Sequence, residues 1–234
     1  MVLSSVTAFF KVNNPELPWY RQSPEQIGYP LQSFICLGLL IWFRRNYPLR
    51  RPLYPFRDFG LAAALAVVGI AIWILPSLIF QWFHLENSPQ KDFWAWLGIA
   101  PRLEGFDPSL FDNNPPAFWL AVGLRFFRMV IVVPFVEEIF WRGFLHRYLT
   151  DSWAFRPFYN LPIGIHSWKV YFIVTTGVMF IHASEDWFAA WVYGSLTYWL
   201  SVKTKSLSAC VFMHAVANLL LGIYTLQTRQ WGFW

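Results

Sequence analysis

Two carboxylates and a guanidinium lie close together in one of the most apolar regions of the chain, in the segment Glu137-Glu138-Ile139-Phe140-Trp141-Arg142. Placing an ionisable side chain near the centre of a bilayer costs about 2.5–3.5 kcal/mol on insertion scales. Such groups persist in apolar helices when they pair with one another or take part in chemistry. This segment is therefore the first candidate for an active site.

Helical geometry separates the roles of these three side chains. Glu138 and Arg142 are four residues apart, so they share one helix face, with the acid N-terminal to the base in the order that favours an ion pair. Glu137 is rotated by about 100° from that face, and its neighbour four residues on is the apolar Trp141. We predict a Glu138–Arg142 pair and a Glu137 that needs a partner elsewhere. Alternatively, Glu137 snorkels to the membrane surface or caps a helix that breaks at Pro134.

Three more polar side chains lie in apolar segments. His182 ends an apolar run, and His214 and Asn218 lie four residues apart on one face of another. A single intramembrane histidine is usually satisfied by packing, and an asparagine can bond within its own helix. Groups on three helices can nevertheless converge and supply a general base, a second acid or base and oxyanion donors. We predict such a site, formed by Glu137, His182, His214 and Asn218.

The composition predicts a polytopic membrane protein. Hydrophobic residues occupy 56% of the 234 positions and charged residues 13%, while the 15 Trp and 24 Phe far exceed the usage of soluble domains. A net charge of +5 would suit nucleic-acid binding in a soluble chain, but here the basic residues lie in loops between apolar segments. We therefore expect a multi-pass membrane protein, with membrane lipids and no nucleic acid as partners. The expected location is a bacterial-type cell inner membrane.

Apolar windows of sufficient length predict an all-α transmembrane bundle of roughly six to eight helices. The candidate spans lie near residues 30–43, 60–83, 117–149, 168–184, 187–202 and 206–227. The loop after the first span is rich in arginine, which predicts a cytoplasmic loop and both termini outside. The predicted divisions are a polar N-terminal segment 1–29, membrane helices and a loop at 30–116, a catalytic core at 117–227 and a tail at 228–234.

The polar residues also match the motifs of a known family. A first motif, EExxxR, stands at residues 137–142, and a third, HxxxN, stands as His214-Ala215-Val216-Ala217-Asn218. The second motif, FxxxH, is half kept, because His182 is present but Val178 stands where the family has Phe. Thr204-Lys205-Ser206-Leu207 is similar to the family's TGSL turn. On these motifs, residues 120–222 resemble the CAAX protease and bacteriocin-processing family, also called the type II CAAX prenyl endopeptidase or ABI family.

The resemblance implies an intramembrane endopeptidase that hydrolyses peptide bonds of membrane-associated proteins, among them CAAX-type prenylated ones. It implies a glutamic-type mechanism that needs no cofactor. The implied roles are water activation by Glu137 and His182, oxyanion stabilisation by His214 and Asn218, and support of the site by Glu138 and Arg142.

Other interpretations stay open on the sequence alone. A metallo-type protease would hold Zn²⁺ through Glu137, His182 and His214, with water as the fourth ligand. A non-catalytic immunity or scaffold protein, or a transporter that relays protons, would also retain intramembrane charge. Arg125 and Arg128 either hold a substrate carboxylate, pair with acidic groups or reach the membrane surface. Simple spans also place His182 and Glu137 at different depths, so their convergence requires shifted boundaries or a broken helix.

Overall fold

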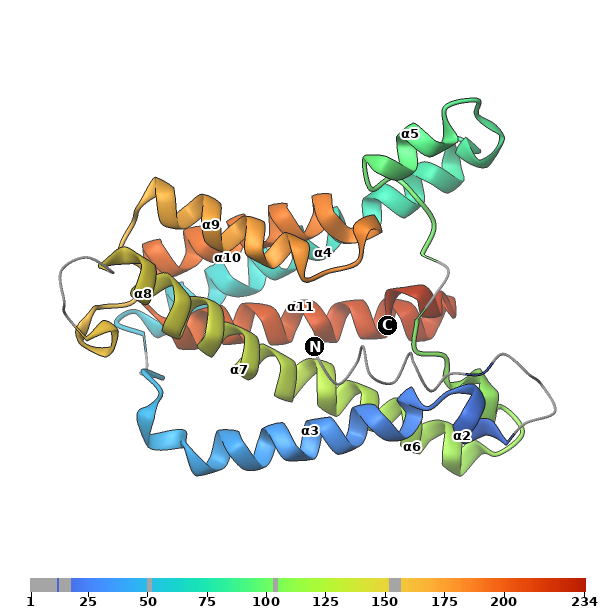
Figure 1. The fold of residues 1–234 in the computed structure, drawn as a ribbon, viewed down its shortest axis with the longest axis horizontal. Coiled ribbons are helices and arrows are strands. Elements are labelled where there is room, and N and C mark those ends of the chain that lie inside the picture. Colours follow the sequence, from blue (N-terminus) through green and yellow to red (C-terminus); the bar gives the residue numbers. More distant parts are fainter. Residues whose placement is uncertain (1–11, 13–17, 50–51, 103–104, 152–156) are drawn as a thin grey trace.

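The computed structural model describes residues 12, 18–49, 52–102, 105–151 and 157–234, and these form a helical bundle without strands (Figure 1). Most of the predicted segment 1–29 lies outside these ranges, as do Arg50 and Arg51 of the arginine-rich loop. The α-helices are α2 (Trp19–Gln22), α3 (Glu25–Trp42), α4 (Pro55–Trp82), α5 (Lys91–Trp96), α6 (Pro115–Phe126), α7 (Val133–Glu138), α8 (His146–Thr150), α9 (Trp168–Phe180), α10 (Trp187–Thr204) and α11 (Leu207–Thr228). Short 3₁₀ turns lie at Arg44–Asn46, Leu85–Asn87, Pro108–Phe111, Phe158–Asn160, Ser184–Asp186 and Trp231–Phe233.

Helices α6, α7 and α8 form one continuous helix of 36 residues, Pro115–Thr150, which we call the long helix. Two π-helical segments, Phe127–Val132 and Ile139–Leu145, join its parts. Proline usually breaks or kinks a helix because it lacks an N–H and its ring crowds the preceding turn. Here the wider π turn before Pro134 accommodates the residue, and the helix continues, so the alternative of a helix that breaks at this position does not hold.

The membrane spans expected from the sequence correspond to α3, α4, the long helix, α9, α10 and α11. Within the described ranges, α4, the long helix and α11 are long and apolar enough to cross a membrane, while α9 is apolar but shorter. Large apolar side chains also cover the outside: Phe56 is 93% exposed and Trp42 is 81% exposed. Apolar surface of this kind is expected where a protein faces lipid. The prediction of an all-α transmembrane bundle is confirmed.

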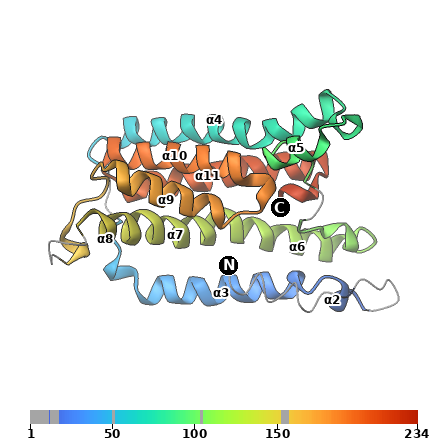
Figure 2. The ribbon, with the colours of Figure 1, turned by 45° about the horizontal axis from the view of Figure 1, so that its top comes forward.

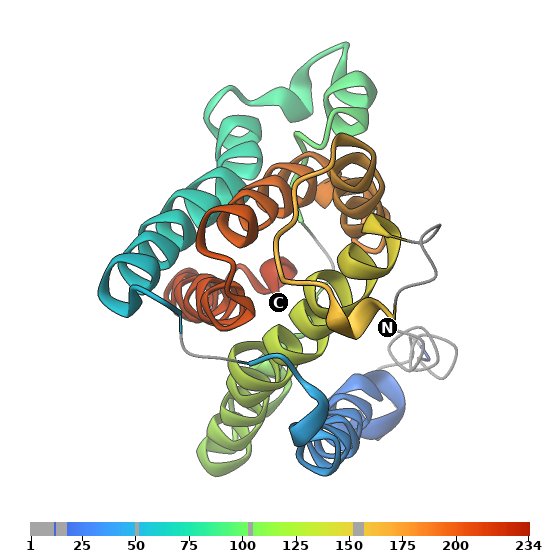
Figure 3. The same ribbon diagram turned by 90° about the vertical axis from the view of Figure 1, so that its left-hand side faces the viewer.

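Helix α11 lies at the centre and contacts α4, α10 and the long helix (Figure 3). Helices α9 and α10 pack against each other, and α3 lies along the outer side of the long helix (Figure 2). Small buried residues on α4, Ala62, Ala66 and Gly69, allow its neighbours to approach closely. A Cβ atom on Gly69 would lie only 2.7 Å from the ring of Tyr193 on α10. These contacts fix the positions of α4, α10 and α11, the helices that surround the site.

Three loops meet at one end of the bundle. A common surface hollow is lined by the loop after α3, by α8 with the segment that follows it, and by the α10–α11 turn. Leu53, Arg147 and Lys205 are among its lining residues. Basic loops that gather at one end are compatible with the predicted cytoplasmic side. The orientation in the membrane stays a prediction.

Candidate active site

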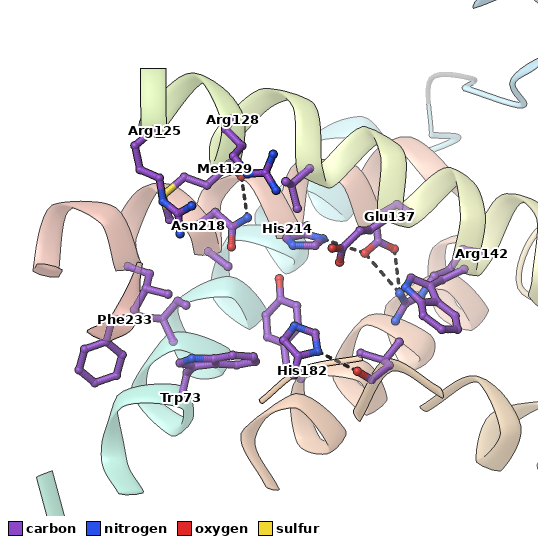
Figure 4. A pocket seen from close by; sticks show the side chains of 18 of the residues that line it. Trp73, Arg125, Arg128, Met129, Glu137, Arg142, His182, His214, Asn218 and Phe233 are labelled. Carbon is purple, nitrogen blue, oxygen red and sulfur yellow. Dashed lines mark hydrogen bonds and ion pairs between the residues drawn. The ribbon is translucent and has the colours of Figure 1, made fainter. Parts of the chain in front are cut away.

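A cavity of about 310 Å³ lies between α4, the long helix, the end of α9, α10 and α11. Its volume falls at the lower end of the range for small-molecule sites, about 300–1,000 Å³. The lining contains all the residues predicted for the site, namely Glu137, His182, His214 and Asn218 (Figure 4). The structure thus brings together polar groups from three separate segments, while their catalytic roles stay predictions.

The difference in depth expected between His182 and Glu137 does not arise. Helix α9 has 13 residues and ends at Phe180, partway along the long helix (Figure 2). His182 follows directly and faces the same cavity as Glu137. Because α9 ends earlier than the predicted span, His182 and Glu137 can line the same cavity.

Glu138 lies at the centre of a buried polar network. One of its oxygens, Oε2, is 3.2 Å from Nη1 of Arg142, which is the ion pair predicted from the four-residue spacing. Its other oxygen, Oε1, accepts a hydrogen bond of 3.0 Å from Nδ1 of His214. Arg142 also donates through Nη2 to the carbonyl of Gly194 on α10. Glu138 therefore links the long helix to α11, and Arg142 links it to α10. Glu138 also orients His214, in a way that the sequence did not reveal.

Glu137 differs sharply from its neighbour in the chain. Glu138 is only 1% exposed, whereas Glu137 is partly exposed and lines the cavity. Within the described ranges, no hydrogen bond or ion pair engages the Glu137 carboxylate, and the long helix continues past it. Glu137 therefore does not cap a broken helix, and its carboxylate is available to a ligand in the cavity.

The His182 ring is held by its own backbone. Nδ1 donates to the carbonyl of Val178 at 2.7 Å, so in the neutral ring Nε2 carries the lone pair. Trp73 of α4 packs edge-on against the ring at 5.4 Å between centroids. Because the hydrogen bond uses a main-chain oxygen, the valine that replaces the family's phenylalanine at position 178 does not remove it.

Asn218 is positioned by the proline in the long helix. In the π register, the N–H of Val133 bonds to the carbonyl of Arg128. The next residue, Pro134, has no N–H to offer to the following carbonyl, that of Met129. Asn218 Nδ2 donates to this oxygen at 2.6 Å instead. The second N–H and the oxygen of the amide remain for a ligand in the cavity.

The Asn218→Ala variant should lose about 1–3 kcal/mol of unfolding free energy, because the Met129 carbonyl loses its side-chain donor. Denaturant unfolding in detergent measures this change, and Asn113→Ala, at an exposed position, is the matched control. An Asn218→Ala protein as stable as wild type would show that this hydrogen bond contributes little.

Sequence reasoning missed Tyr193 and Trp73, which also line the cavity. The buried hydroxyl of Tyr193 has no hydrogen-bond partner in the described part of the chain. Its ring packs edge-on against His214 at 5.9 Å between centroids. The chain contains so many aromatic residues that no local sequence pattern distinguishes Tyr193 and Trp73 from aromatic residues that face lipid.

The side chains that could bind a metal ion do not lie in the arrangement of a metal site within the described ranges. Over the described ranges, no group of three or more His, Cys, Asp or Glu side chains has the arrangement of a metal site. Nδ1 of His182 is bonded to the Val178 carbonyl and Nδ1 of His214 to Glu138, which leaves Nε2 of each ring as the nitrogen that could bind a metal ion. The set of Glu137, His182 and His214 would have to rearrange to bind Zn²⁺ through three ligands.

Comparison with known protein families identifies part of the chain. Residues 117–220 match the family of type II CAAX prenyl endopeptidase Rce1-like proteins. No curated protein and no solved structure matches the chain. The matched region contains all but the first two residues of the long helix, His182 and about two-thirds of α11. It therefore includes every charged or amide side chain of the cavity wall discussed above. Residues 117–220 thus form a domain of the Rce1-like type II CAAX prenyl endopeptidase family.

Proposed function

We propose that this membrane protein is a glutamic-type endopeptidase that hydrolyses peptide bonds of membrane-associated proteins inside the cavity. The observation that carries the proposal is the composition of the cavity wall. Three groups face one space of about 310 Å³: a carboxylate that makes no hydrogen bond or ion pair within the described ranges, an imidazole whose Nε2 carries a lone pair, and an amide with one unused N–H. A purely structural role would not require these three groups to remain available together.

In the proposed first step, a water molecule lies between Glu137 and His182. Neutral water is a weak nucleophile, so it needs a base within hydrogen-bond reach while it attacks. Nε2 of His182 accepts one hydrogen bond from the water and orients its lone pair toward the scissile carbonyl carbon. The Glu137 carboxylate takes the other proton as the C–O bond forms.

In the second step, the tetrahedral oxyanion accepts hydrogen bonds from His214 and Asn218. The amide of Asn218 donates its remaining N–H. His214 already donates Nδ1–H to Glu138, so donation from Nε2 requires a proton on both nitrogens. The Glu138 carboxylate, which it shares with Arg142, stabilises that charge. Glu137 then returns its proton to the leaving nitrogen as the C–N bond breaks, which yields an acid and an amine.

The substrate follows from the family and the setting of the site. Peptide segments of membrane-associated proteins, including CAAX-type prenylated ones, would reach the cavity from the lipid phase, in a membrane that we propose to be a bacterial-type inner membrane. The test is cleavage of a panel of labelled peptides by the purified protein in nanodiscs. The panel includes a farnesylated CAAX peptide and its unlipidated equivalent. Mass spectrometry should detect two fragments that together contain one added water, and intact peptides throughout would contradict the proposal.

Metal removal tests the choice between the glutamic and the metallo mechanism. Incubation with EDTA or 1,10-phenanthroline should leave the rate of peptide cleavage unchanged, because the proposed base and oxyanion donors are protein groups. The measurement compares initial rates before and after chelation, with dialysis to remove the chelator. Loss of activity that added Zn²⁺ restores would favour the metallo mechanism through Glu137, His182 and His214.

A further inference from the structure

One residue that lines the catalytic cavity lies outside the matched family domain. Phe233 belongs to the 3₁₀ turn Trp231–Phe233, beyond the matched residues 117–220. It lines the cavity and is only 8% exposed. Figure 4 shows it beyond Trp73, at the other end of the cavity from Arg142. The proposed chemistry does not use this residue, so its place in the cavity wall needs another explanation.

A second cavity, which we call the outer cavity, lies against the same residue. It has a volume of about 580 Å³, and its lining also contains charged side chains, those of Arg102, Glu185 and Asp186. Among the described residues, those that line both cavities are Trp73, His182, Leu221 and Phe233. These shared residues therefore form the boundary between the catalytic cavity and the outer cavity.

A guanidinium holds the ring of Phe233 in this boundary. The Cζ atom of Arg102 lies over the ring, 4.5 Å from its centroid, and a cation–π contact of this kind is stronger when it is shielded from water. The guanidinium is fixed in turn: Nη2 donates to the carbonyl of Trp73 at 3.0 Å, Nη1 donates to Oγ of Ser77 at 2.8 Å, and Nε donates to Asp186. Arg102 therefore connects Phe233 to α4 and to the turn before α10.

The backbone on both sides of Phe233 is held as well. The main-chain oxygen of Trp234 accepts a hydrogen bond of 3.1 Å from the N–H of Phe106. On the other side, a Cβ atom on Gly232 would overlap the main-chain oxygen of Arg102, so the two segments approach as closely as a glycine allows. Phe233 is therefore a fixed part of the wall, against which a ligand in the cavity must fit.

This wall lies beside the proposed chemistry. Trp73 packs edge-on against the ring of His182, at 5.4 Å between centroids, and His182 orients the attacking water in the proposed mechanism. A substrate side chain next to the cleaved bond must therefore fit between His182 and the shared boundary. The catalytic cavity is small, at about 310 Å³, and closely packed apolar walls accept additional volume poorly.

We infer that Phe233 is a specificity-determining residue, which closes one end of the catalytic cavity and sets the largest substrate side chain that fits beside the cleaved bond. The inference rests on the proposed hydrolytic function. A smaller residue at this position should join the catalytic cavity to the outer cavity and admit bulkier side chains. A Phe233 that only stabilises the fold would instead change the cleavage of all peptides by the same factor.

The experiment uses a peptide that wild type cleaves, with leucine or the bulkier naphthylalanine placed in turn on each side of the cleaved bond. Wild type should cleave the naphthylalanine peptide with a kcat/KM about 10-fold or more below that of the leucine peptide, the scale on which apolar pockets discriminate by size. Phe233→Ala should remove most of this difference, and Phe233→Leu, which disturbs the packing less, should remove part of it. An unchanged ratio in both variants would overturn the inference. The matched control is Phe83→Ala, at a 70% exposed position directly after α4.

Thiol labelling tests the same wall without any peptide cleavage. Ala217 lines the catalytic cavity, so Ala217→Cys in a Cys36→Ser background places a thiol there, while the remaining native thiol, Cys210, is fully buried. In nanodiscs, a bulky methanethiosulfonate should react with this thiol more slowly than a small one, and Phe233→Ala should reduce the difference about 10-fold. That result without cleavage of any peptide would support the inference and count against the proposed function alone. An unchanged difference would overturn the inference, even if wild type cleaves peptides.

Discussion

The Glu137→Gln protein should hydrolyse peptides about 100- to 10,000-fold more slowly than wild type, the range for loss of a positioned general base. The amide of glutamine keeps the shape of the side chain but cannot accept the proton of the attacking water. Initial rates on the best substrate of the peptide panel measure the loss, under single-turnover conditions so that product release does not mask the chemical step.

Stability separates a catalytic role for Glu137 from a structural one. Because its carboxylate makes no hydrogen bond or ion pair in the described ranges, Glu137→Gln should unfold at nearly the same denaturant concentration as wild type. Glu86→Gln, at an exposed glutamate in the loop after α4, is the matched control for both measurements. Full activity in Glu137→Gln would remove this residue from the mechanism and favour a scaffold role for the site.

The Glu138→Ala protein, unlike Glu137→Gln, should lose about 3–5 kcal/mol of unfolding free energy. The substitution leaves Arg142, which is 2% exposed, with its charge buried and unpaired. It also removes the acceptor that holds Nδ1 of His214. Denaturant unfolding in detergent is the measurement, and activity should fall as well, since His214 loses its orientation.

Two controls test the physical reason for this loss. Asp112→Ala breaks an ion pair with Arg229 in which both side chains are exposed, and it should cost less than about 1 kcal/mol. The double variant Glu138→Leu/Arg142→Met removes both buried charges and should recover most of the stability lost in Glu138→Ala. If Glu138→Ala were no less stable than Asp112→Ala, the buried network would contribute no more to the unfolding free energy than an exposed ion pair does.

The parts of the fold that could be predicted from the sequence are those set by local pattern. Apolar length located the spans, because a helix that crosses a membrane needs a continuous run of apolar residues. The four-residue spacing identified the Glu138–Arg142 pair, because helical periodicity places these side chains on one face. The same periodicity distinguished Glu137, whose carboxylate makes no hydrogen bond or ion pair within the described ranges.

The parts that could not be predicted depend on contacts between distant segments. Trp73 and Tyr193 belong to the cavity only because of how α4 and α10 pack against α11, and their sequence neighbourhoods resemble lipid-facing stretches. The π register that frees the Met129 carbonyl for Asn218 also has no sequence signature beyond Pro134. The depth of His182 depended on where α9 ends, and helix ends are set by tertiary contacts as much as by local sequence.

The turn before α11 shows how a departure from a family motif can be accommodated. Lys205 stands where the family has glycine, and it adopts a left-handed backbone with φ of 54°. Glycine reaches this conformation without steric cost, whereas a residue with a Cβ needs compensation. Here Nζ of Lys205 donates to the carbonyl of Gly164, and Ser206 caps α11 by accepting from the N–H of Ala209 at 3.2 Å. The turn therefore keeps its shape, and with it the register that places His214 in the cavity.

The central claim is that Glu137 and His182, from different segments of the fold, act on one water molecule. The most direct test is kcat/KM for Glu137→Gln, His182→Ala and the double variant, with His84→Ala, at an exposed histidine, as a control. Residues that act as a unit are strongly non-additive, so the double variant should be no more than a few-fold slower than the slower single variant. Losses that multiply in the double variant would mean that the two side chains act independently, which contradicts the shared water.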